Sequence, residues 1–215
     1  MGLISKNYDE VRHLMKPGDV IAFGGKTHFS NIIKAFTLSP VSHIAVVLHT
    51  KIVADDEDRY FNQLIESTSL DGFSGVQITR ASTRVKYDGE VWWMPLSDEI
   101  RSRFNEKAFF TFLLRQEGHE YDIAQTFNAA VDGLDSLPFG IDGPTWNEED
   151  YSKFFCSELV AAGLEKSGAI GRVNASEVTP IDLCRWKIYQ NDYYQLNGAP
   201  KTLSRYNTAN PTDWQ

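Results

Sequence analysis

The sequence predicts a single domain of the α+β class, and three features of its 215 residues support this prediction. Apolar runs of strand length follow one another from residue 42 to residue 96 without helices between them. After Ser97 the apolar residues change to helical spacing. The composition, 42% hydrophobic and 13% aromatic, is that of a chain with a packed core. We expect residues 1–195 to form the domain and residues 196–215 to form a polar C-terminal tail with little to pack.

Five short apolar runs are expected to be strands, because each has strand length and is bounded by turn residues. They are residues 20–23, 42–49, 63–67, 75–79 and 91–96. Since the last four succeed each other directly, they favour an antiparallel meander over a doubly wound parallel sheet.

Helical spacing or helix-start signals mark six further segments. They are residues 1–16, 29–36, 98–115, 121–131, 151–166 and 175–186, the last with its start at Thr179-Pro180. Ser97 is placed to cap the helix that begins at residue 98. Residues 132–150 are rich in Gly, Pro and acidic residues, and either cover a cleft as a lid or form a plain surface excursion.

Charge and hydropathy exclude several classes of protein. The 21 Lys and Arg against 29 Asp and Glu give a net charge of −8, which excludes nucleic-acid binding by bulk charge. No run approaches the ~20 apolar residues that cross a bilayer, so we expect no stable membrane insertion. The first residues lack the apolar core of a secretory signal, so we expect a cytoplasmic protein, with delivery by lysis or secretion left open. The oligomeric state is not indicated.

Two cysteines, Cys156 and Cys184, fit neither a disulfide scaffold nor the paired spacing of a zinc site. No metal or organic cofactor is expected. Cys184 is interpreted as a small buried hydrophobe. Cys156 lies at the start of a predicted helix, where unpaired backbone N–H groups and the helix dipole favour a thiolate and stabilise a neighbouring oxyanion. From its position alone, an inert helix-start cysteine and a nucleophile are equally acceptable interpretations.

Two polar residues interrupt otherwise apolar strands. His43 begins one run, and Glu66 lies within the next among Leu64 and Ile65. Each has an ordinary interpretation, a satisfied core histidine and an edge carboxylate that faces water. If the two strands pair, however, His43 and Glu66 face each other, and the carboxylate fixes the imidazole tautomer for general-base catalysis.

Six motifs in a fixed order resemble the circularly permuted NlpC-type papain-like hydrolases, the YiiX/YebB-like group. The order, with the histidine strand before the cysteine helix, is the reverse of that in papain. The motifs are Gly-Asp-Val-Ile at 18–21, Ser-Pro-Val-Ser-His and its apolar run at 39–47, Glu66, Tyr-Asp at 121–122, Phe-Cys-Ser-Glu-Leu-Val at 155–160 and Thr-Pro-Ile-Asp-Leu at 179–183.

The resemblance implies a papain-like (permuted NlpC-type) fold, in which an antiparallel β-sheet or half-barrel packs against the helix that carries the nucleophile. It implies Cys156 as nucleophile, His43 as general base and Glu66 as the third member of a triad. Tyr121 and Ser157 are implied at the substrate or oxyanion position, although a packing role for Tyr121 is equally consistent.

The expected activity is that of a thiol hydrolase which cleaves an amide or peptide bond, in a cell-wall-type peptide for example, through a thioester acyl-enzyme. Its partner is then a peptide, amide or acyl substrate. One alternative is a lipid-directed acyltransferase or phospholipase with the same thiol, which requires an apolar patch; Phe139, Trp146 and the Trp92-Trp93 pair are the candidates. The other is a non-catalytic binding module on the same fold.

Overall fold

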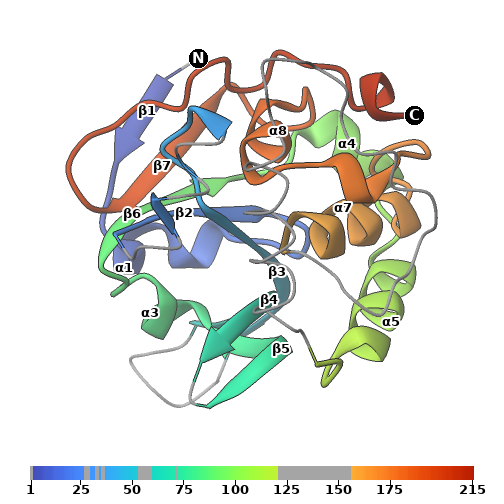
Figure 1. Ribbon diagram of the computed structural model, residues 1–215, viewed down its shortest axis with the longest axis horizontal. Coiled ribbons are helices and arrows are strands. Elements are labelled where there is room, and N and C mark those ends of the chain that lie inside the picture. Colours follow the sequence, from blue (N-terminus) through green and yellow to red (C-terminus); the bar gives the residue numbers. More distant parts are fainter. Residues whose placement is uncertain are drawn as a thin grey trace, which may run out of the picture.

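The computed structural model describes residues 2–26, 30, 31, 34, 37–52, 60–70, 72–120 and 156–215. Within these residues a seven-stranded sheet runs through the molecule in the order β1-β7-β6-β2-β3-β4-β5 (Figure 1). The strands are β1 (Gly2–Ser5), β2 (Val20–Gly25), β3 (His43–Ile52), β4 (Tyr60–Leu70), β5 (Phe73–Arg80), β6 (Gly89–Met94) and β7 (Asp192–Asn197). With its helices this sheet makes the fold a mixed α+β architecture, as predicted.

The five predicted strands are confirmed as β2 to β6, and they pair antiparallel. Two further strands, β1 and β7, were not predicted. They pair in parallel with each other, and β7 joins them to β6 at one side of the sheet. The prediction of a helix over residues 1–16 is therefore wrong for Gly2–Ser5. Helical structure begins only at α1 (Tyr8–Val11), behind an Asn7–Glu10 capping box, and continues as η1 (Arg12–Leu14).

Each face of the sheet is covered by its own apolar cluster. Residues of α1 and of α3 (Ala81–Arg84) pack on one face. The other face is covered by α4 (Asp98–Arg103), α5 (Glu106–Gln116), α7 (Cys156–Lys166) and α8 (Pro180–Arg185) (Figure 1). No helix in the described part of the chain is both long and apolar enough to cross a bilayer.

The predicted helix over residues 98–115 is two helices, because the chain leaves helical geometry at Phe104 and Asn105. The Asn105 side chain accepts a hydrogen bond from the backbone N–H of Ala108 and so caps a new helix, α5. The predicted cap at Ser97 is present, with its side chain accepting from the N–H of Ile100.

Helices α5 and α7 approach closely where α7 carries a glycine. A Cβ on Gly163 would lie 3.1 Å from the Leu113 side chain and 3.3 Å from Phe109. The absence of that atom lets the two helices come together.

The C-terminal residues pack against the core, contrary to the prediction that they have little to pack. Leu203 and Tyr206 are each only 4% exposed and belong to the apolar cluster on the α7 face. Trp214, in η3 (Pro211–Trp214), packs edge-on against Trp186. Individual residues of 198–215 therefore contribute to the core, and β7 itself extends to Asn197.

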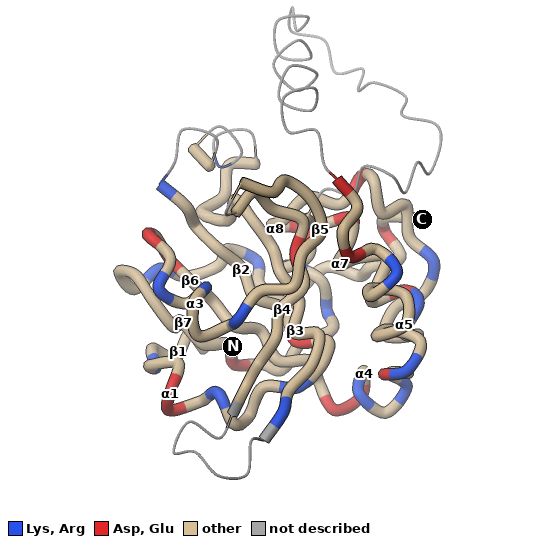
Figure 2. Tube along the Cα trace, turned by 90° about the horizontal axis from the view of Figure 1, so that it is seen from below, with Lys and Arg blue, Asp and Glu red and all other residues tan. Residues whose placement is uncertain are grey.

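Charged residues of both signs are spread over the outer elements of the described chain (Figure 2). Two carboxylates are instead buried in the interior of the described part of the protein. Asp19 is fully buried and pairs with Arg101, while its carboxylate also accepts from the indole N–H of Trp93 and the backbone N–H of Leu96. Glu66 is the second buried carboxylate.

Candidate functional site

Strand pairing brings the two predicted polar residues to the same face of the sheet. In the β3–β4 ladder Val47 lies opposite Leu64. Because side chains alternate along a strand, His43 shares a face with Val47, and Glu66 shares a face with Leu64. Ring Nε2 of His43 lies 2.7 Å from Oε2 of Glu66, so the predicted contact between them is present.

This contact sets the tautomer of His43. Glu66 as a carboxylate only accepts hydrogen bonds, so Nε2 of His43 carries a proton and donates it. In the neutral ring Nδ1 is then the acceptor, free to take a proton from a thiol. The Phe23 ring, opposite His43 in the β2–β3 ladder, lies 5.4 Å from the imidazole centroid and limits its movement.

The Glu66 side chain is completely buried, and both of its oxygens have partners. Thr79 donates its hydroxyl to Oε1 at 2.5 Å. Arg84, on α3, donates Nη2–H to Oε2 at 2.8 Å, and its Nε lies 2.8 Å from Oε1 as an ion-pair contact. These partners resolve the problem of a carboxylate buried in an apolar strand.

The same contacts set the charge of Glu66. Burial is the largest influence and raises the pKa of the carboxyl, but the hydrogen bond and charge of His43, the charge of Arg84 and the Thr79 hydroxyl outweigh it. The net effect lowers the pKa of Glu66 to about 2. The carboxylate is therefore ionised at neutral pH.

Cys156 is the first residue of α7 and is partly exposed. Its side chain is close enough to His43 to influence the pKa of that imidazole. Burial lowers the pKa of His43, but the negative charge and hydrogen bond of Cys156, together with those of Glu66, raise the pKa to about 9. The side chains of Cys156 and Glu66 therefore both stabilise the protonated form of the imidazole.

The other sequence-predicted residues have different surroundings. Ser157 is 3% exposed in the first turn of α7. Tyr121 lies outside the described residues, as do the candidate lid and the predicted helix over 121–131. Cys184 is confirmed as a buried residue of α8: its thiol donates to the Pro180 carbonyl, and burial raises its pKa well above the ordinary value.

The apolar patch proposed for a lipid substrate receives no support from its described members. Trp92 and Trp93 are 0% and 2% exposed and lie in the core on opposite faces of β6. Phe139 and Trp146 lie outside the described residues.

Arg84 is the residue of this cluster that sequence reasoning missed. It stands in Ala-Ser-Thr-Arg at 81–84, a stretch without periodicity, where an arginine is ordinarily a surface residue. Arg84 is buried because it pairs with the Glu66 carboxylate on a strand of the sheet, and the sequence around Arg84 gives no sign of this pairing.

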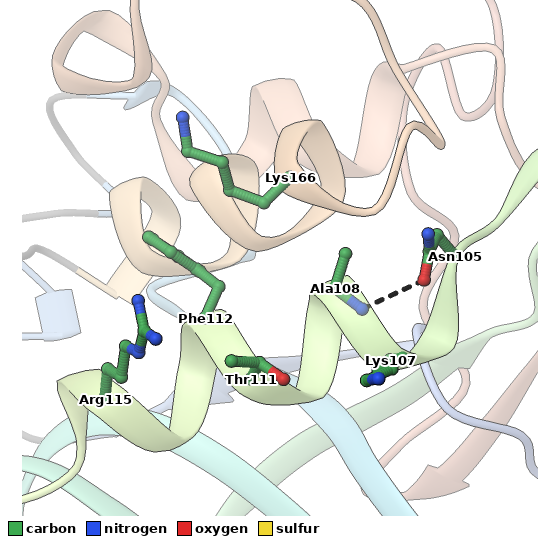
Figure 3. Close-up of a pocket in the computed structure, with 7 residues that line it drawn as sticks. All are labelled: Asn105, Lys107, Ala108, Thr111, Phe112, Arg115 and Lys166. Carbon is green, nitrogen blue, oxygen red and sulfur yellow. Dashed lines mark hydrogen bonds between the residues drawn. The ribbon is translucent and has the colours of Figure 1, made fainter.

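A separate pocket of about 530 Å³ lies between α5 and the end of α7 (Figure 3). Its lining includes three basic side chains, Lys107, Arg115 and Lys166. Lys166 is the last residue of α7 and Cys156 the first, so the rise of an α-helix separates them by ~15 Å. This pocket is therefore distinct from the thiol site.

No three His, Cys, Asp or Glu side chains are grouped to hold a metal ion within the described residues. In addition, both oxygens of Glu66 are occupied by hydrogen bonds from the protein.

Comparison with known proteins gives a structural neighbour. No family model matches the chain, and no curated protein matches its sequence. Among solved structures, the chain is similar to the metalloprotein YiiX from Escherichia coli O157:H7, with a TM-score of 0.44 and 16% sequence identity. The match covers 71% of this chain and 66% of the YiiX chain. The structural neighbour is thus a YiiX/YebB-like protein.

Proposed function

We propose that this chain is a thiol hydrolase of permuted papain-like architecture, which cleaves an amide or peptide bond. The observation that carries the proposal is that His43 interacts with both Glu66 and Cys156. Nε2 of the imidazole is hydrogen-bonded to the buried Glu66 carboxylate, and the side chain of Cys156 acts on the same ring and raises its pKa. A nucleophile, a base and an oriented acceptor in this order are the elements of thiol acyl transfer.

In the proposed reaction the Cys156 sulfur attacks the substrate carbonyl carbon as a thiolate, while His43, whose pKa is raised to about 9, holds the proton on Nδ1. The tetrahedral intermediate collapses when His43 returns the proton to the leaving amine, so the C–N bond breaks and a thioester remains. His43 then takes a proton from water, whose oxygen attacks the thioester. The second tetrahedral intermediate collapses, so the C–S bond breaks and His43 returns its proton to the sulfur. The products are a carboxylic acid and the restored thiol.

The start of α7 supports the first of these steps. The first turn of an α-helix leaves backbone N–H groups without intrahelical partners, and the dipole places positive potential there. We assign these N–H groups, including that of Ser157, to the stabilisation of the oxyanion beside the sulfur. Tyr121 is proposed as a further contact to the substrate.

Selective alkylation tests the proposal. Iodoacetamide at neutral pH should label Cys156 much faster than Cys184 in the folded protein, with Cys156→Ser as the control that removes the label. Cys184 serves as an internal reference, because it is buried and its pKa is raised. Slow labelling of both cysteines at one rate would exclude an activated thiol and leave a non-catalytic binding module.

The substrate class requires a second measurement. Incubation with muropeptides should add one acyl mass to Cys156, detected by intact-mass spectrometry and peptide mapping, and the Cys156→Ser variant should gain none. A stable acyl adduct from phospholipid vesicles but not from peptides would replace the amidase proposal with lipid acyl transfer.

A further inference from the structure

We propose that Arg84 is a positioning residue of the thiol site, which holds the Glu66 carboxylate in place against His43. This inference rests on the proposed function, because a positioning role has meaning only if the Cys156–His43 pair reacts.

The first argument is the shared oxygen. Oε2 of Glu66 accepts both from Nε2 of His43 at 2.7 Å and from Nη2 of Arg84 at 2.8 Å. A second Arg84 atom, Nε, lies 2.8 Å from Oε1. A carboxylate held at both oxygens cannot rotate away from the imidazole without breaking a charge-assisted contact.

The second argument is that Arg84 is itself immobilised. Its side chain is 9% exposed, and its guanidinium lies 4.9 Å from the centre of the Phe23 ring and 5.3 Å from that of Tyr87. The same Phe23 ring contacts the imidazole of His43. One aromatic side chain therefore packs against both His43 and Arg84, and these two groups and Glu66 form one packed unit.

The third argument is charge balance. With thiol and imidazole neutral, Glu66 and Arg84 sum to zero. With thiolate and imidazolium formed, the four groups alternate in sign and again sum to zero. Without Arg84 a buried negative charge is uncompensated in both states, so Glu66 would take up a proton more readily. A protonated Glu66 no longer serves as the carboxylate acceptor for Nε2 of His43.

A double-mutant cycle tests the inference, with Arg84→Gln, Glu66→Gln and the combined variant. The readout is the second-order rate of Cys156 alkylation across the pH range. We expect Arg84→Gln to slow alkylation at neutral pH by about tenfold, and to have much less effect when Glu66→Gln is already present. Arg84→Lys, which keeps the charge, should recover part of the rate. Arg80→Gln is the matched control, since Arg80 is an exposed neighbour that contacts Phe61.

Side-chain carboxyl NMR of Glu66 provides a readout that does not depend on the thiol. The Glu66 titration should move to higher pH in Arg84→Gln and remain in place in Arg80→Gln. If Arg84→Gln does not fold, the alkylation rate of the combined variant, which removes both charges together, is compared with that of Glu66→Gln alone. The rate of Arg84→Lys is then compared with that of wild type.

The two proposals fail in different ways. If wild-type Cys156 reacts no faster than Cys184, the proposed function fails. If wild-type Cys156 reacts rapidly but Arg84→Gln leaves the rate unchanged, or slows it equally with and without Glu66, the positioning role is overturned.

Discussion

His43 and Glu66 lie 23 positions apart in the chain, yet Nε2 of the imidazole is 2.7 Å from a carboxylate oxygen. Antiparallel pairing of β3 and β4 accounts for this proximity, because it places both residues on one face. The contact offsets part of the free-energy cost of burying the carboxylate, and it fixes the tautomer of the imidazole ring. It also leaves Nδ1 of His43 for the sulfur of Cys156.

Removal of the imidazole should separate a reactive thiol from an ordinary one. We expect His43→Gln to slow the alkylation of Cys156 at pH 7 by ~10²-fold, because the glutamine cannot take the thiol proton. The measurement is the rate of iodoacetamide incorporation, followed by mass spectrometry. His119→Gln is the control, since His119 is exposed and outside this cluster. Equal rates in His43→Gln and wild type would contradict a base role for His43.

The lowered pKa of Glu66 predicts a pH-dependent contribution to stability. The carboxyl titrates near 4.5 in the unfolded chain and at about 2 in the fold. A group with a depressed folded pKa stabilises the fold above its unfolded pKa and loses that contribution as the pH falls toward the folded value. The free energy of unfolding should therefore differ most between wild type and Glu66→Gln above pH 4.5, and the difference should shrink toward pH 2.

Urea unfolding at a series of pH values between 2 and 6 measures this difference. Glu99→Gln, at an exposed position in α4, controls for the general effect of removing a carboxylate. If the difference in the free energy of unfolding between wild type and Glu66→Gln stayed constant over this range, the pKa of Glu66 would not be lowered in the folded protein.

The reach of sequence reasoning differs between elements for physical reasons. The strand β3 was predictable, because its apolar run from Ile44 to Leu48 is long enough to require burial. Leu64 and Ile65 marked β4, and His43 and Glu66 stood out as polar residues beside these apolar ones. The strand β1 could not be predicted from the sequence, because Gly2–Ser5 is short and pairs only with β7, which lies far away in the chain. The role of Arg84 could not be predicted either, because Arg84 is buried through its ion pair with Glu66 and not through any pattern in the neighbouring sequence.

The buried ion pair of Asp19 and Arg101 should be essential to the fold. Asp19 also accepts hydrogen bonds from Trp93 and Leu96, so Asp19→Ala leaves these two buried donors without an acceptor and Arg101 without its carboxylate. We expect a loss of about 3–5 kcal/mol in the free energy of unfolding, measured by urea denaturation. Asp9→Ala, at an 80% exposed side chain, should change it by less than about 0.5 kcal/mol. Similar small effects for both variants would refute this role.

The packing of the C-terminal residues makes a prediction opposite to that for a polar tail. Leu203 is 4% exposed and belongs to the main apolar cluster, so Leu203→Ala removes buried methyl groups and leaves a cavity. We expect a loss of about 2–5 kcal/mol in the free energy of unfolding. Leu114→Ala, at a 37% exposed position on α5, should cost markedly less, because part of that side chain already contacts water. Thermal and urea unfolding of the two variants measure the difference. Wild-type stability in Leu203→Ala would mean that residues 198–215 do not contribute to the core. A large loss would show that a chain truncated at residue 197 lacks part of the packing of the main apolar cluster.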